Sequence, residues 1–258
     1  MISNRAIVIM LFIFSLLCAC TKDTVRQSAA GEEGQKENNS VNIVPSNIKN
    51  NSGIVLSFDD YFPDSWEENF ELFDKYNAKV TFFVQLESPT QFCFNAQERG
   101  HEIGYHTISH LSLLTLSRKQ FYRETISRIN VFKDKRIDLT SFAYPFGYYE
   151  EWMNDELLKH YKIVRGFNVS TCVYTIPLPH GFVYSKSIDN VIYKQETNFQ
   201  NDITQLLEFA KENQNSVILL TSHNIGSNDW GITKERLEFI LKKCVEYDMK
   251  FYTYKDLF

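Results

Sequence analysis

Short apolar runs alternate with amphipathic segments from residue 53 to the end of the chain. The apolar runs are predicted strands at 54–58, 80–84, 102–105, 141–144, 162–166, 216–221 and 250–253. The amphipathic segments are predicted helices at 65–76, 91–99, 117–132, 154–161, 201–213 and 233–247. This repeated alternation predicts an α/β fold built on a parallel sheet or barrel.

Local signals refine some of these boundaries. Ser65 with Glu68 and Ser117 with Gln120 have the spacing of a capping box, which predicts a helix start at each serine. Residues 169–198 show no clear period, so we expect them to be irregular.

The N-terminus has the pattern of an export signal. Residues 6–18 are almost entirely apolar, too short for a stable transmembrane helix, and typical of the apolar region of a signal peptide. The run closes with Leu17-Cys18-Ala19-Cys20, which resembles a bacterial lipobox and implies a signal peptide over 1–19 and a lipid on Cys20; an ordinary secretory signal is the alternative. We expect a lipoprotein of the bacterial cell envelope, anchored to the outer membrane or to the periplasm-facing membrane without spanning it.

Residues 20–52 are polar and predict a flexible tether, which leaves 53–258 as one globular domain, expected to be monomeric. The cysteines of that domain are odd in number and lack metal-site spacing, so buried free thiols are expected. The formal net charge of −5, with no basic run outside the export segment, excludes nucleic-acid binding as the expected function.

Ionisable residues stand at the ends of three predicted strands. Asp59 and Asp60 follow strand 54–58, His106 and His110 follow strand 102–105, and His223 follows strand 216–221. The carboxyl ends of parallel strands meet at one edge, where active sites lie.

Two histidines four residues apart can converge on one divalent transition metal. One aspartate would complete a His-His-Asp set with open positions, the layout of a catalytic zinc site. The other aspartate could accept a proton from water while His223 protonates the leaving group. These parts predict metal-assisted hydrolysis of an amide or ester.

Four motifs resemble, in order, those of the polysaccharide deacetylases with NodB homology (carbohydrate esterase family 4). They are Ser-Phe-Asp-Asp, His-Thr-Ile-Ser-His, Phe-Ala-Tyr-Pro-Phe-Gly and the late strand ending in His223. The resemblance spans residues 53–258. It implies a distorted (β/α) barrel with about seven strands and removal of acetyl groups from N- or O-acetylated sugars of a glycan.

The resemblance also implies a role for each matching residue. Asp59 would be the catalytic base, His223 the catalytic acid, and Asp60, His106 and His110 the ligands of a divalent metal, usually Zn²⁺. The backbone N–H of Phe146 would help to form the oxyanion hole. Thr107 would steady the histidine loop, and Tyr144 and Pro145 would support the substrate.

The sequence departs from the family pattern at two points. Ala143 stands where the family has an arginine that pairs with the catalytic aspartate, and Arg165 is a candidate replacement. The motif that supports the acid histidine is not recognisable, and Asp189, or Asp229 with Trp230, are the candidates.

Two other functions stay open: hydrolysis of a non-sugar amide, and glycan binding without catalysis. Aromatic residues make up 15% of the chain and could fill the core or line a sugar groove. The candidates for the pocket wall are Phe62, Trp66, Tyr148, Tyr149, Trp152 and Trp230. His101, His160 and His180 are expected to be structural, although His180 could reach a pocket rim.

Overall fold

The computed structural model describes residues 51–168 and 171–258. The predicted signal peptide, the lipidation site and nearly all of the tether lie outside these residues. Ser52, at the end of the predicted tether, is buried, and its hydroxyl donates a hydrogen bond to the carbonyl of Asn213.

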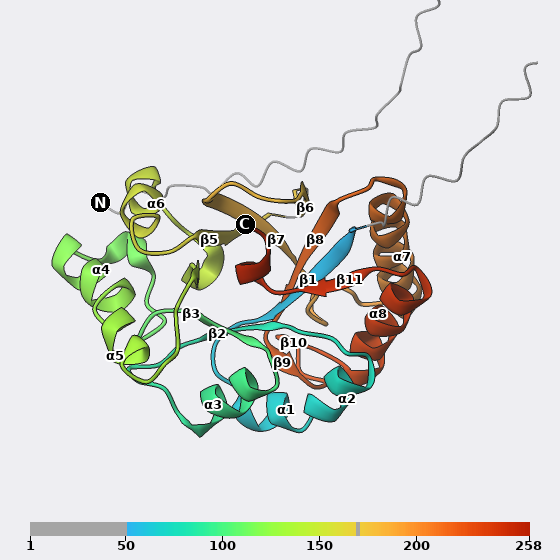
Figure 1. The fold of residues 1–258 in the computed structure, drawn as a ribbon, viewed down its shortest axis with the longest axis horizontal. Coiled ribbons are helices and arrows are strands. Elements are labelled where there is room, and N and C mark those ends of the chain that lie inside the picture. The colour runs from blue at the N-terminus through green and yellow to red at the C-terminus, as the bar shows by residue number, and fades with distance from the viewer. Residues whose placement is uncertain (1–50, 169–170) are drawn as a thin grey trace, which may run out of the picture. The chain divides into compact units, whose positions relative to one another are not determined.

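Parallel strands form a closed seven-stranded barrel, which confirms the predicted fold (Figure 1). The strands are β1 (Gly53–Phe58), β2 (Thr81–Val84), β3 (Glu102–Tyr105), β4 (Ser141–Ala143), β5 (Ile163–Phe167), β7 (Gly181–Ser187) and β8 (Ser216–Ser222). They pair in that order, and β8 closes the ring by pairing with β1 along its whole length.

Two further strands distort the barrel at its amino-terminal end. The short β6 (Val173–Thr175) pairs antiparallel with the first half of β8, whose second half pairs with β7. Likewise β11 (Lys250–Tyr252) pairs with the first half of β1, whose second half pairs with β2. The predicted last strand therefore lies beside the ring and not in it.

A buried carboxylate ties this amino-terminal end together. Glu102 accepts hydrogen bonds from the hydroxyls of Thr81, Thr140 and Ser141 and from the backbone N–H of Lys255. Lys255 lies in the C-terminal turn η3 (Tyr254–Asp256), so the carboxylate joins that turn to the barrel.

Helices surround the barrel on the outside (Figure 1). They are α1 (Pro63–Glu67), α2 (Phe70–Lys75), α3 (Gln91–Glu98), α4 (Arg118–Thr125), α5 (Ile129–Lys133), α6 (Glu151–Leu157), α7 (Glu196–Glu212) and α8 (Lys234–Glu246). Short turns η1 (Leu113–Thr115) and η2 (Pro145–Gly147) and a small two-stranded sheet, β9 (Asn224–Ile225) with β10 (Gly231–Ile232), complete the fold. Within the described ranges, every helix is too short or too polar to cross a bilayer.

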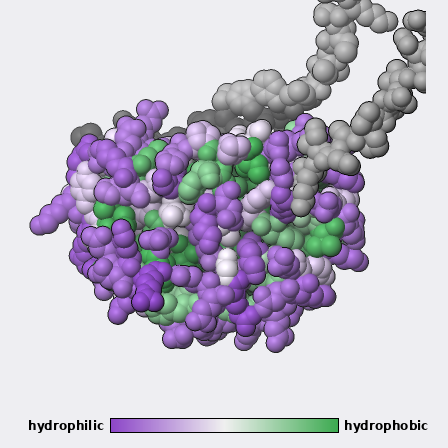
Figure 2. Space-filling view, viewed as in Figure 1, coloured by the Kyte–Doolittle hydropathy of each residue, from purple (hydrophilic) through white to green (hydrophobic). Residues whose placement is uncertain are grey.

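Aromatic side chains fill much of the layer between barrel and helices. Trp66 is fully buried and stacks on Phe82 with ring centres 4.9 Å apart, and Phe92 packs against both. The face seen in Figure 2 is mostly hydrophilic, with hydrophobic residues in small separate patches. The high aromatic content is therefore largely a property of the core. Cys93, Cys172 and Cys244 are buried free thiols, as expected.

The predicted helix 65–76 is wrong in its details. It is two short helices, because Asn69 leaves the helical conformation at φ −106° and ψ 5°. Ser65 does not cap a helix, since α1 starts before it at Pro63, and its hydroxyl accepts a hydrogen bond from the N–H of Ile225. The capping box of Ser117 and Gln120 is confirmed at the start of α4, although that helix ends at Thr125.

The prediction of an irregular segment at 169–198 is also wrong. It contains β6, β7 and the start of α7. Residue Ser185 is polar but fully buried on β7, and its hydroxyl bonds to that of Thr221 on β8. Because strand prediction looks for apolar residues at buried positions, a strand with a buried serine escapes it.

Candidate active site

A cavity of about 610 Å³ opens at the carboxyl ends of the barrel strands. Its lining combines predicted site residues with aromatic and polar neighbours: Asp59, Asp60, His106, His110, Phe146, Tyr148, Phe167, Asn168, Ser187, Asp189, Ile192, His223 and Trp230. The ionisable residues that follow β1, β3 and β8 in the sequence therefore do meet in one cavity.

Three of these residues form a set of converging electron-pair donors. The Oδ1 atom of Asp60 lies 3.1 Å from Nε2 of His110 and 3.4 Å from Nε2 of His106. Nδ1 of His106 lies 2.8 Å from the carbonyl oxygen of Ala143 and must carry a proton to donate a hydrogen bond to it. In the neutral imidazole, Nε2 then has no proton, and its lone pair is free for a metal. Asp60 Oδ1 is buried without a hydrogen bond. A divalent cation would satisfy all three donors, so the residues fit a metal.

Electrostatics favour the ionised form of this aspartate. Burial by itself raises the pKa of Asp60, but the neighbouring imidazoles of His106 and His110 outweigh burial and hold the pKa well below its usual range. The carboxylate is therefore ready to act as a ligand at neutral pH.

Strained backbone is concentrated here. Asp60, Thr107, His110 and Phe146 all adopt left-handed conformations, with φ of 75°, 71°, 52° and 59°. For residues other than glycine, such conformations cost on the order of 1–3 kcal/mol each and persist only where the surroundings enforce them. Such strain is typical of functional sites.

Hydrogen bonds hold the histidine loop in this conformation. The Thr107 hydroxyl accepts from the backbone N–H of His110 at 3.0 Å. The buried carboxylate of Glu124, on α4, accepts from the backbone N–H groups of Ile108 and Ser109 at 3.1 and 2.9 Å. Sequence reasoning missed Glu124; a charged residue on the buried face of an amphipathic helix was the available signal.

We therefore predict that Glu124→Ala weakens Zn²⁺ binding roughly 10- to 100-fold, as loss of an outer support of a metal site does. The loop N–H groups lose their acceptor and the two imidazoles no longer converge in one arrangement. Competition titration against a chelator measures the affinity. Glu98→Gln, at an exposed acid on α3, is the control, and an affinity equal to that of the control would contradict the role.

Asp59 pairs with the arginine that sequence analysis proposed. Nη2 of Arg165 donates to Oδ2 of Asp59 at 2.5 Å, and both side chains are fully buried. Arg165 lies directly beside Ala143 in the register of β5 and β4, and its guanidinium packs 4.3 Å from the ring centre of Phe167. Oδ1 of Asp59 has no hydrogen bond. One carboxylate oxygen is thus anchored while the other can accept a proton.

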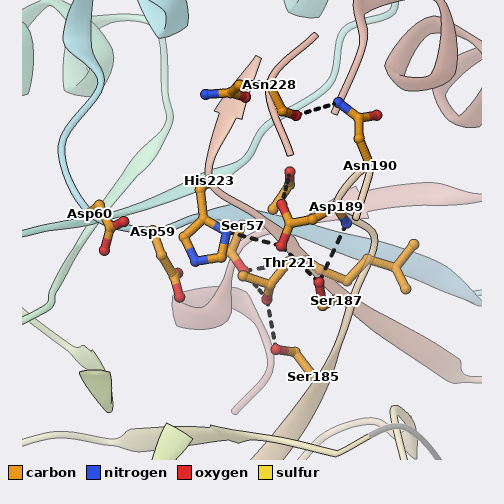
Figure 3. A network of polar contacts seen from close by, with 12 residues as sticks. Ser57, Asp59, Asp60, Ser185, Ser187, Asp189, Asn190, Thr221, His223 and Asn228 are labelled. Carbon is orange, nitrogen blue, oxygen red and sulfur yellow. Dashed lines mark hydrogen bonds and ion pairs between the residues drawn. The ribbon is translucent and has the colours of Figure 1, made fainter. Parts of the chain in front are cut away.

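His223 pairs with Asp189 (Figure 3). Its Nδ1 lies 3.0 Å from Oδ2 of Asp189, which is fully buried and also accepts hydrogen bonds from the hydroxyls of Ser187 and Ser222. Burial lowers the pKa of His223, but the hydrogen bond that His223 donates to Asp189 and the charge of Asp59 outweigh burial and raise the pKa to about 8. The imidazole is therefore mainly protonated at neutral pH.

Of the two candidates for supporting His223, the structure brings only Asp189 to it. Asp229 is exposed and lies outside the cavity lining. Trp230 lies next to His223 with ring centres 5.9 Å apart. Trp66, considered for the pocket wall, is in the core and donates its indole N–H to the backbone carbonyl of His223 at 2.8 Å.

Other candidates lie away from the cavity. The Tyr144 hydroxyl donates to Asn154 on α6, and Pro145 is buried, so neither lines the cavity. Phe62, Tyr149 and Trp152 pack on the core. His101 is buried, and burial lowers its pKa to about 3, which keeps it neutral. His160 and His180 precede β5 and β7, at the opposite end of the barrel.

The comparisons with known proteins agree with the resemblance. A family model described as polysaccharide deacetylase matches residues 47–162, which contain Asp59, Asp60, His106 and His110. This match bears out the resemblance to the polysaccharide deacetylases that the motifs gave. No curated protein matches the chain.

Solved structures share the fold at low identity. Peptidoglycan deacetylase PdaC from Bacillus subtilis is 18% identical with a TM-score of 0.55, covering 81% of this chain and 91% of that chain. A family 4 carbohydrate esterase from Streptomyces lividans in complex with acetate is 13% identical with a TM-score of 0.56, covering 78% and 92%. A mutant of a family 4 pseudoenzyme with restored enzymatic activity is 16% identical with a TM-score of 0.56, covering 81% and 68%. Because catalysts and a pseudoenzyme share this fold, function must be argued from the site.

Proposed function

From the match of residues 47–162 to the polysaccharide deacetylases, we propose that this chain is a metal-dependent hydrolase that removes acetyl groups from N- or O-acetylated sugars of a glycan. One observation carries the proposal: the Asp60–His106–His110 set shares a cavity with both a buried aspartate and an aspartate-paired histidine. A glycan-binding module would have no use for all five side chains.

Asp60, His106 and His110 would hold the metal, for which Zn²⁺ suits two imidazoles and a carboxylate best. When bound, such a metal supplies Lewis acidity that polarises the acetyl carbonyl and makes water easier to deprotonate. The Phe146 backbone, held at φ 59° next to His110, would present its N–H to the developing oxyanion.

Proton transfer falls to the two supported side chains. Asp59 accepts a proton from the attacking water through its unpaired Oδ1, while Arg165 holds the other oxygen. His223 donates a proton to the leaving nitrogen or oxygen of the sugar, which its raised pKa allows at neutral pH. The bond between the acetyl carbon and that atom breaks, and acetate leaves.

The proposal extends to location. The lipobox-like sequence at Cys20 supports a lipoprotein of the bacterial cell envelope, tethered through residues 20–52. Such an anchor would bring the enzyme to envelope, exported or environmental glycans. Labelling with a radioactive fatty acid, and its loss in Cys20→Ser, would test the anchor.

We predict that the purified chain releases acetate from an acetylated glycan only with a divalent metal. Chelation should reduce the rate to background and added Zn²⁺ should restore it. Asp59→Asn should lower kcat about 100-fold or more, because the general base is lost. Acetate release from oligomers of N-acetylglucosamine and from acetylated xylan measures the rate, with Asp229→Asn as the control.

Each alternative has its own outcome in this experiment. Release from a small acetamide with none from any glycan would favour a non-sugar amide hydrolase. Glycan retention without acetate release, with metal bound, would contradict catalysis and favour a glycan-binding protein.

A further inference from the structure

Two loop segments meet at the proposed acid His223. One is the post-β7 segment (residues 188–195), which carries its partner Asp189. The other is the β9–β10 segment (residues 224–232), which carries Trp230, whose ring contacts that of His223. Strands β9 and β10 have two residues each, and so short a pair is not stable by itself. Contacts with other parts of the chain must therefore hold the β9–β10 segment in place.

Asn190 joins these two segments. Its backbone N–H donates to the carbonyl of Gly231 at 2.7 Å. Its side-chain amide nitrogen donates to the carbonyl of Gly226 at 2.9 Å and to that of Asn228 at 2.8 Å, the second of which is drawn in Figure 3. All three acceptors are backbone carbonyls, so Asn190 holds the path of the β9–β10 segment whatever its side chains are.

Arg236, on α8, fixes the orientation of this amide. Its Nη1 donates to Oδ1 of Asn190 at 3.1 Å, so the opposite orientation would place the amide NH₂ against the guanidinium and the amide oxygen against two carbonyls. Its Nε and Nη2 donate to Glu196 at 2.7 Å and to the carbonyl of Tyr193 at 3.1 Å. Arg236 is buried, and its rigid planar guanidinium holds three acceptors at once.

The contacts of Asn190 adjoin both groups that touch His223. Asp189 directly precedes Asn190 in the chain. Trp230 directly precedes Gly231, whose carbonyl accepts from the Asn190 N–H. A change at Asn190 therefore displaces the carboxylate and the indole together. Hydroxyls at the ends of β7 and β8 also hold the Asp189 carboxylate, so such a change weakens its contact with His223 without abolishing it.

We infer that Asn190, oriented by Arg236, is a positioning residue for the proposed acid: it holds Asp189 and Trp230 in their contacts with His223. This inference rests on the proposed function, in which His223 protonates the leaving group. A proton donor works only when it points at the atom that receives the proton, so the support of the imidazole affects the rate of proton transfer more than the binding of substrate.

Steady-state kinetics on the full chain test this role, with acetate release from the acetylated glycan that the parent chain hydrolyses. Asn190→Ala should lower kcat about tenfold, as loss of an outer support does, and leave KM and the metal content within about twofold of the parent. Arg236→Lys should have the same effect to a smaller extent, because an ammonium cannot hold three acceptors in one plane.

Asn213→Ala is the matched control. The Asn213 amide also donates to a backbone carbonyl, that of Phe209 at 2.7 Å, but it lies just before β8, at the opposite end of the barrel from the cavity. This variant should keep the kcat of the parent chain.

A double-mutant cycle separates positioning from general destabilisation. If Asn190 acts mainly through Asp189, then Asn190→Ala should lower kcat by at most about twofold when Asp189→Asn is already present, because the two residues act as one unit. A merely structural role would lower kcat by the same factor in both backgrounds, since the effects of independent sites add in free energy.

Fluorine NMR of the chain labelled with 5-fluorotryptophan gives a readout that needs no turnover. The Trp230 resonance, assigned by its absence from Trp230→Phe, should shift in Asn190→Ala and Arg236→Lys and stay in place in Asn213→Ala. Trp152, on α6, is the internal reference, and its resonance should stay in place in every variant.

A kcat of Asn190→Ala equal to that of Asn213→Ala, equal factors in the two backgrounds of the cycle, or an unmoved Trp230 resonance would each overturn the inference. The proposed function fails separately: no acetate release by the parent chain, together with a shifted Trp230 resonance in Asn190→Ala, would remove the catalysis and leave Asn190 as the support of the residues around His223.

Discussion

Arg165→Ala is expected to lower kcat at least 100-fold while sparing the bound metal. The guanidinium is the partner of a fully buried carboxylate, and it is supplied by β5 and not by the strand that carries the family's arginine. Without it the buried Asp59 carboxylate loses the cation that is hydrogen-bonded to its Oδ2, and the orientation of Oδ1 toward the attacking water is no longer fixed. Acetate release and metal content, measured on the same preparation, separate the proton-transfer effect from loss of the metal.

A second substitution makes this prediction sharper. Breaking a buried ion pair costs about 3–5 kcal/mol of stability, so the single variant can lose activity through unfolding. Ala143 and Arg165 are partners in the register of β4 and β5, so their side chains point to the same side of the barrel wall. Moving the arginine, as Ala143→Arg with Arg165→Ala, should recover at least tenfold of the lost rate. Full activity of Arg165→Ala alone would show that the pair has no catalytic role.

Asp189→Asn is expected to lower kcat roughly 10- to 100-fold and to move the alkaline limit of activity to lower pH. Burial lowers the pKa of His223, but the hydrogen bond to Asp189, together with the charges of Asp59, Asp189 and Asp60, raises the pKa to about 8. His223 must be protonated to donate, so activity is lost as the pH rises through this pKa. Asparagine keeps the shape but removes the charge, so the pKa falls and the loss occurs at lower pH.

The full dependence of kcat on pH, from about 5 to 10, measures this shift. Asp229→Asn is the matched control, since Asp229 is acidic, nearby in sequence to His223, and exposed. The parent chain should lose activity near pH 8, and the control should do the same. An alkaline limit that stays in place in Asp189→Asn would show that Asp189 does not tune the acid.

From the sequence alone came the α/β class, the barrel through the motif resemblance, and the three side chains that converge as candidate metal ligands. Most barrel strands are short apolar runs. Because such strands are buried on both faces, they can be recognised in the sequence as continuous runs of apolar residues. His106 and His110 are four residues apart, and Asp60 lies two residues after the first strand, so the convergence of these candidate ligands depends mainly on local geometry and on the shared edge of parallel strands.

Only the tertiary structure decided which distant residues complete the site. Asp59 and Arg165 are 106 positions apart, and His223 and Asp189 are 34 apart, so no local spacing relates them. Trp66 and Trp230 are alike in sequence terms, yet one is in the core and the other lines the cavity. Which side chains pair, and which stay exposed, depends on strand register and on closure of the barrel. For example, β7 has no clear sequence signal, yet its pairing with β8 brings Ser187 and the nearby Asp189 beside β8. Tertiary packing decides which of these side chains pair and which line the cavity, because these contacts form only when all the strands are in place.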